Sequence, residues 1–76
     1  MPHVIVKIVT GRSEAQKAEI AEAVTRALMA SAGSAEANIS VGIEDIAKEA
    51  WVEEVYRPDI LGRAGTLYKK PGYDPL

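Results

Sequence analysis

The stretch that decides the fold is residues 3–17, HVIVKIVTGRSEAQK. Its first part, His3 to Val9, is rich in β-branched side chains and is interrupted at Thr10-Gly11, which predicts a strand followed by a turn. Its apolar character, with Lys7 as the only interior charge, favours a strand that is buried on both faces. Ser13 and Gln16 then have the spacing of a capping box, in which two side chains satisfy free backbone N–H groups at a helix start. We therefore expect a helix directly behind the strand.

A helix and a second apolar run complete the predicted core. The helix is expected to run to about Ser31 and to stop at Gly33. Residues 38–43 then alternate large apolar and small side chains, which predicts a second strand. A strand, a helix of roughly 18 residues and another strand form a βαβ unit with parallel strands and a right-handed crossover. Residues 2–43 are thus expected to be an α/β core of the βαβ kind.

The rest of the chain is predicted to form shorter and less regular elements. A short helix is expected over about residues 47–56, and Pro58 should end or restart it because proline lacks a backbone donor and clashes with the preceding turn. Residues 57–76 hold several glycines and prolines, so we expect an irregular C-terminal arm with one helical turn, packed on its own or a partner subunit. The whole of residues 1–76 is interpreted as a single domain.

Composition excludes several classes of function. The 76 residues contain no cysteine and one histidine, His3, which leaves no cysteine zinc site, no histidine-pair metal site and no conventional Ser/His or Cys/His catalytic pair. The formal net charge of −2, with both signs interspersed, gives no footprint for nucleic acid. No stretch is long and apolar enough for a membrane span. We expect a cytoplasmic protein without nucleic-acid or membrane partners.

The βαβ unit also predicts a partner of its own kind. Two strands and one helix leave one sheet face and a sheet edge open, and a chain of this length buries only about 60% of its unfolded surface. We expect two subunits to pair into a four-stranded sheet with the helices on one face. A homodimer is the preferred assembly, and a hexamer is the alternative.

Pro2 is the candidate catalytic residue. It follows Met1 and precedes the first strand, and removal of Met1 would turn its nitrogen into a secondary amine. Model α-amino groups titrate at roughly 7.7–8.0, and an apolar pocket favours the neutral, basic form further. If Met1 persists, that nitrogen is an amide and the base does not exist.

Pro2, a strand, the string Gly11-Arg12-Ser13-x-x-Gln16-Lys17 and a second strand together resemble the 4-oxalocrotonate tautomerase family. The resemblance covers most of residues 2–51. The ending Leu67-Tyr68-Lys69-Lys70-Pro71-Gly72-Tyr73 is more similar to the dimeric, slightly longer PptA-like branch than to the short hexameric members. The resemblance implies an isomerase that interconverts enol and keto forms of small unsaturated or aryl 2-oxo acids, with an amino-terminal proline as acid and base.

The resemblance also suggests roles for individual residues. Pro2 matches the catalytic proline, and Arg12 matches the arginine that binds a substrate carboxylate or steadies charge on the carbonyl side. Trp51 falls where the family has an aromatic pocket wall. Ser40 is a departure, because the short members carry a second arginine there and a serine does not hold a carboxylate bidentately. A monocarboxylate with an apolar or aromatic remainder is therefore favoured as substrate over a dicarboxylate.

Three hypotheses about function follow from the same residues. The first is a tautomerase, in which proton transfer by Pro2 with charge stabilisation by Arg12 requires no metal and no organic cofactor. The same fold with another reaction, hydration or dehalogenation of unsaturated acids, is the second hypothesis. A dimer that binds a small molecule without turnover is the third. His3 is expected on the strand face opposite to Pro2 and is interpreted as structural.

Overall fold

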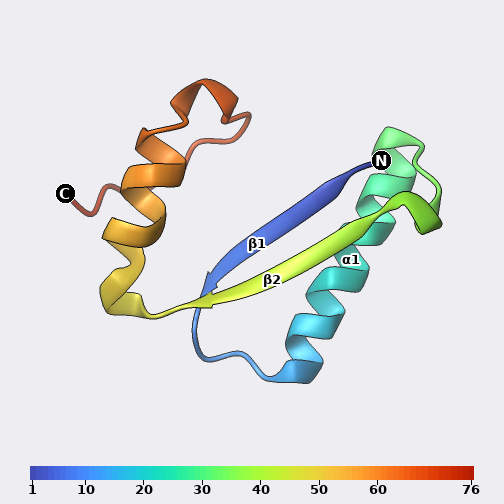
Figure 1. Cartoon of the computed structure of the whole chain (residues 1–76), viewed down its shortest axis with the longest axis horizontal. Helices are drawn as coiled ribbons and strands as arrows, with labels where there is room; N and C mark the ends of the chain where they lie inside the picture. Colours follow the sequence, from blue (N-terminus) through green and yellow to red (C-terminus); the bar gives the residue numbers. More distant parts are fainter.

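The computed structural model covers the whole chain, residues 1–76. Two strands, one long helix and a helical C-terminal segment make up the molecule (Figure 1). The regular elements are β1 (His3–Val9), α1 (Glu14–Ala32), β2 (Ser40–Ile46) and the C-terminal helix η3 (Val52–Leu61). Short 3-10 turns lie between and after them: η1 (Glu36–Asn38), η2 (Lys48–Ala50) and η4 (Ala64–Thr66).

The strands β1 and β2 pair in parallel, in a register that runs from His3 beside Ser40 to Val9 beside Ile46. The connection between them contains α1, which lies along one face of the strand pair (Figure 1). An ion pair of 2.8 Å between Lys17 on α1 and Asp45 on β2 joins the helix to this face. The structure thus confirms the βαβ unit.

Local signals place α1 where the sequence predicts it. The Ser13 hydroxyl accepts a hydrogen bond from the backbone N–H of Gln16 at 3.1 Å, and the Gln16 side-chain oxygen accepts from the N–H of Ser13 at 2.9 Å. The helix ends one residue later than expected, and Gly33 follows in the left-handed conformation at φ 66°. Only glycine adopts this conformation without the steric cost of a Cβ atom, which explains the stop.

The second strand lies further along the chain than its apolar pattern predicts. Asn38 belongs to a 3-10 turn, in which its N–H donates to the carbonyl of Ala35 at 3.0 Å. The strand then continues beyond Ile43 to Ile46, because Lys7 to Val9 of β1 lie opposite these residues and extend the parallel pairing. Asp45 is paired with Lys17 on α1.

The helix η3 corrects the prediction of a helix over about residues 47–56 that Pro58 ends or restarts. Its hydrogen bonds span five residues, as in a π-helix, and it runs through Pro58 to Leu61. The N–H of Gly62 continues the pattern by donating to the carbonyl of Arg57 at 2.8 Å. Proline removes one donor, but contacts on both sides of it hold the helix together: Tyr56 is buried before it and Asp59 is ion-paired after it. The irregular arm therefore begins after Leu61.

A single chain leaves much of its apolar surface open. Val55 and Tyr56 are its only buried residues, and Ile5 in the middle of β1 is 52% exposed. The expectation that β1 is buried on both faces is therefore wrong for one chain, because only α1 covers the strand pair closely. The Cα radius of gyration is 13.8 Å, whereas a compact domain of this length has about 11.4 Å. No helix has the length and apolar character needed to cross a membrane.

Candidate active site

Pro2, His3 and Ser40 meet at one end of the strand pair. The backbone N–H of Ser40 donates to the carbonyl oxygen of Pro2 at 3.2 Å. The Ser40 hydroxyl lies 2.6 Å from Nδ1 of His3, its neighbour across the two strands. Met1, which precedes these residues, is fully exposed and so contributes nothing to packing. The structure therefore groups two residues expected in the site, Pro2 and Ser40, with a histidine that was expected to be structural.

Arg12 lies beyond the opposite end of β1. Its Nη1 donates to the carbonyl oxygen of Val9 at 3.0 Å, which holds the side chain against the end of the strand. The same side chain borders an open cavity of about 350 Å³ along α1, and no carboxylate forms an ion pair with it. The other residues of that cavity are Gln16, Glu19, Ile20 and Ala23. A permanently charged guanidinium is thus available here for an anion.

Trp51 follows β2 and lies near the same strand end. Its Nε1 donates to the hydroxyl of Tyr73 at 2.9 Å, so the end of the C-terminal arm returns to the indole. Trp51 and Tyr73 line a cavity of about 400 Å³ whose remaining residues are Val9, Lys48, Val52 and Pro75. The lining is apolar except for the Lys48 ammonium and the hydrogen-bonded pair of the Trp51 N–H and the Tyr73 hydroxyl. Lys48 was not expected in the site from the sequence, because its place in the cavity depends on the fold of the arm.

The expected site residues are therefore divided between two ends of the molecule. Pro2 and Ser40 lie at the start of β1 and β2, whereas Arg12 and Trp51 follow the ends of these strands. A strand of seven residues spans about 20 Å at 3.3 Å per residue. One chain does not bring Pro2 within reach of the Arg12 guanidinium or the Trp51 ring.

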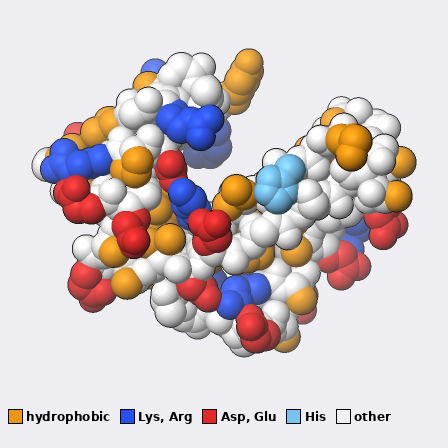
Figure 2. Space-filling model, in the orientation of Figure 1, with side chains coloured by type: hydrophobic (Ala, Val, Ile, Leu, Met, Phe, Trp, Pro, Cys, Tyr) orange, Lys and Arg blue, Asp and Glu red, His pale blue; other side chains and the backbone are white.

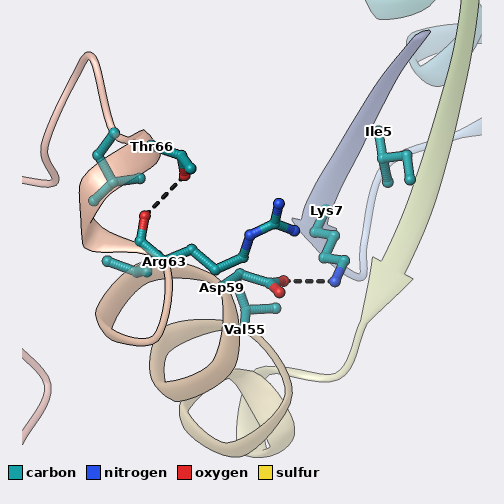
Figure 3. Close-up of a pocket in the computed structure, with 8 residues that line it drawn as sticks. Ile5, Lys7, Val55, Asp59, Arg63 and Thr66 are labelled. Carbon is teal, nitrogen blue, oxygen red and sulfur yellow. Dashed lines mark hydrogen bonds and ion pairs between the residues drawn. The ribbon is translucent and has the colours of Figure 1, made fainter.

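A third group of polar side chains lies on the sheet face opposite to α1. Lys7 on β1 forms an ion pair of 2.5 Å with Asp59 on η3, and Figure 3 shows the guanidinium of Arg63 beside them. The hydrogen bond that Lys7 donates to Asp59 raises the pKa of Lys7 above its ordinary value, against the opposing effect of desolvation. These residues border an open cavity of about 360 Å³ together with Ile5, Val55, Ile60, Thr66 and Leu67. The ion pair is the polar link between the strands and the C-terminal segment.

Comparison with known proteins identifies the fold and the family. The sequence model of the family described as "Tautomerase enzyme" matches residues 2–58. A protein named probable tautomerase from Xylella fastidiosa is 41% identical over the whole of this chain and 93% of its own length. Tautomerase PptA of Pectobacterium carotovorum is 40% identical over 96% of this chain and 97% of its own. These two alignments include the C-terminal arm.

Shorter relatives match the core. The 2-hydroxymuconate tautomerase of Comamonas testosteroni is 45% identical over 67% of this chain and 81% of its own length. A solved structure of the 4-oxalocrotonate tautomerase isozymes from Methylibium petroleiphilum superposes with a TM-score of 0.64 at 38% identity, covering 66% of this chain and 81% of that one. The resemblance in the sequence and the expected fold class are confirmed. The chain belongs to the tautomerase family and is an enzyme of the isomerase class.

Proposed function

We propose that this enzyme is a cofactor-independent tautomerase of small enols and 2-oxo acids, with a site built between two subunits. Pro2, freed by removal of Met1, is the general base and then the general acid. Arg12 of the other subunit binds the substrate carboxylate, and Trp51 of that subunit supplies an apolar wall. The assembly is a dimer in which two βαβ units form one four-stranded sheet.

The main support for this proposal is that the expected site residues lie in two groups, one at each end of the strand pair. Pro2 and Ser40 lie at one end of the strand pair, and Arg12 and Trp51 at the other. When two copies pair edge to edge about a two-fold axis, the adjoining strands run antiparallel, and the start of one strand lies beside the end of its counterpart. Such a pair brings the proline of each subunit to the arginine and tryptophan of its partner. It also pairs a sheet edge that one chain leaves without a partner.

The chemistry of the assembled site follows from these groups. An enol gives up the proton on its oxygen, and the carbon two bonds away takes a proton to give the keto form. The Pro2 nitrogen serves both transfers, because a secondary amine with a pKa near neutrality accepts and returns a proton readily. Arg12 stays charged at every working pH and offsets the negative charge of the substrate.

The lining of the Trp51 cavity favours one class of acid. Apolar and aromatic groups surround it, with Lys48 as its only charged side chain. Ser40 offers a hydroxyl at the position where the short members of the family carry a second arginine, so the proline end of the site has no permanent cation. We therefore favour an aryl or alkyl 2-oxo acid with one carboxylate, of which phenylenolpyruvate is a convenient example.

Two measurements test the proposal. The intact mass of the chain from its native cells should be short by one methionine, which leaves the Pro2 amine free. Pro2→Ala should then lower kcat for phenylenolpyruvate by about 10²–10⁴-fold, the usual contribution of a positioned acid–base group. A chain that retains Met1, or a Pro2→Ala variant with near-normal turnover, would overturn the proline mechanism.

A further inference from the structure

We infer that His3 is a second catalytic residue, which acts with Ser40 to hold the 2-oxygen of the substrate. This inference rests on the proposed function, because it concerns the same site and the same proton transfer. It assigns a task to the one histidine of the chain.

The two side chains form a defined pair. His3 and Ser40 lie directly opposite each other in the parallel register, and the Nδ1 to Oγ distance is 2.6 Å. A second bond fixes the same strand end, from the Ser40 N–H to the Pro2 carbonyl oxygen at 3.2 Å. Successive side chains point to opposite faces of a strand, but the proposed base is the main-chain nitrogen of Pro2. The pair therefore lies at the same start of β1 as that base.

The pair has one hydrogen to offer. A neutral imidazole carries one N–H and a serine carries one O–H, and the contact between them uses one of these two hydrogens. If Ser40 donates to Nδ1, the free hydrogen is on Nε2 of His3. If Nδ1 donates to Ser40, the free hydrogen is on Oγ. Either tautomer leaves a single neutral donor, and Nε2 makes no hydrogen bond within the chain.

The pair is also open to a ligand. Both residues are exposed. Figure 2 shows the histidine at the surface, at the rim of the hollow that separates the strands from the C-terminal segment.

The proton transfer creates a need for such a donor. Pro2 takes the proton from the enol oxygen and returns it to the carbon two bonds away. The 2-oxygen therefore carries negative charge between the two steps. Placed donors at a developing oxyanion are among the largest contributions to catalysis. Arg12 is committed to the carboxylate and lies at the other strand end of its own chain, whereas the His3–Ser40 pair belongs to the chain that supplies Pro2. A neutral donor suits a neutral carbonyl product, which must leave.

The test is a comparison of kcat and ligand binding in His3 variants. His3→Ala should lower kcat for phenylenolpyruvate by about 10–100-fold, below the full 10²–10³-fold of a buried oxyanion donor because the site is open to water. His3→Gln, whose amide also carries an N–H, should recover part of this loss. Ser40→Ala should also lower kcat, as His3→Ala does. Glu44→Gln, an exposed change on the same face of β2, is the matched control and should leave kcat within twofold, as expected for a distant surface site.

Binding separates a role in catalysis from a role in folding. Cinnamate has the aryl group and the carboxylate of the substrate but no 2-oxygen, whereas phenylpyruvate has all three. His3→Ala should weaken inhibition by phenylpyruvate and leave inhibition by cinnamate unchanged. Equal weakening of both, or a kcat within twofold of wild type, would overturn the inference. If Pro2→Ala abolishes turnover while His3→Ala does not, only the role of His3 fails, and the proposed function stands.

Discussion

The indole Nε1 of Trp51 donates a hydrogen bond to the hydroxyl of Tyr73 at 2.9 Å, across 22 positions of the chain. Tyr73 also lies with its ring 5.8 Å from that of Tyr56, one of the two buried residues. The end of the C-terminal arm is therefore fixed against the residue proposed as the pocket wall.

Tyr73→Phe should loosen Trp51 without removing the ring contact to Tyr56. The acceptor of the indole N–H is lost, which costs about 0.5–1.5 kcal/mol for a typical hydrogen bond. Because Trp51 is the only tryptophan, its fluorescence should shift to the red, and KM should rise more than kcat falls. Tyr68 is fully exposed, so Tyr68→Phe is the control and should change neither. Equal effects of the two variants would contradict a specific role for Tyr73.

The ion pair between Lys7 and Asp59 should hold the C-terminal segment to β1. Asp59→Asn removes the charge that faces Lys7, and backbone hydrogen exchange across residues 52–61 should become faster. The pair of Glu53 and Arg57, at 2.9 Å, is the control, because it lies within η3 and links no other element. If Glu53→Gln accelerates exchange as much as Asp59→Asn does, the ion pair is not what attaches the segment.

Alkaline pH should loosen the same segment. Burial raises the pKa of Tyr56 above 10.0, with the charges of Asp74 and Tyr73 acting in the same direction, and the Asp59 hydrogen bond raises the pKa of Lys7 above 10.5. Between the unfolded and the folded pKa values the unfolded chain binds fewer protons, so the free energy of unfolding falls as pH rises. The free energy of unfolding, measured from denaturation curves, should therefore fall above about pH 10. Tyr56→Phe should reduce this loss of stability. A stability that stays constant as pH rises through this range would contradict it.

Gly62 should be required at the end of η3. A Cβ atom there would lie 2.6 Å from the carbonyl oxygen of Pro58 and 3.1 Å from that of Arg57. Gly62→Ala should cost about 1–3 kcal/mol, as overpacking against fixed atoms does. Gly65→Ala is the control, because no atom lies within 4 Å of its added Cβ. Denaturation at equal protein concentration compares the two, and similar losses would show that the crowding at Gly62 is relieved.

Local patterns were sufficient to predict the elements that depend on neighbouring residues. The bounds of β1 follow from its β-branched run, and the start and end of α1 follow from Ser13 and Gly33, whose effects reach only a few residues. Pro58 shows the limit of such reasoning. Its local effect is to end a helix, but burial of Tyr56 and the ion pair of Asp59 come from distant parts of the chain and keep η3 continuous.

The candidate site was predicted in its residues but not in its arrangement. Pro2 and Arg12 were singled out together, yet one chain places them at opposite ends of β1. The partner of Ser40 was missed because His3 lies 37 positions away, and only the strand register makes them neighbours. The Trp51 cavity depends in the same way on the return of Tyr73 to the core.

Subunit mixing tests the central claim, that each site combines Pro2 of one subunit with Arg12 of the other. Pro2→Ala and Arg12→Ala chains, each nearly inactive alone, would be unfolded together, refolded as a mixture and assayed with phenylenolpyruvate. A mixed dimer then has one site with both changes and one intact site, so a random mixture should recover about a quarter of the wild-type activity. Mass spectrometry of the intact dimers confirms that the mixed species has formed. Activity that stays at the level of the separate variants, with mixed dimers present, would contradict a site shared between subunits.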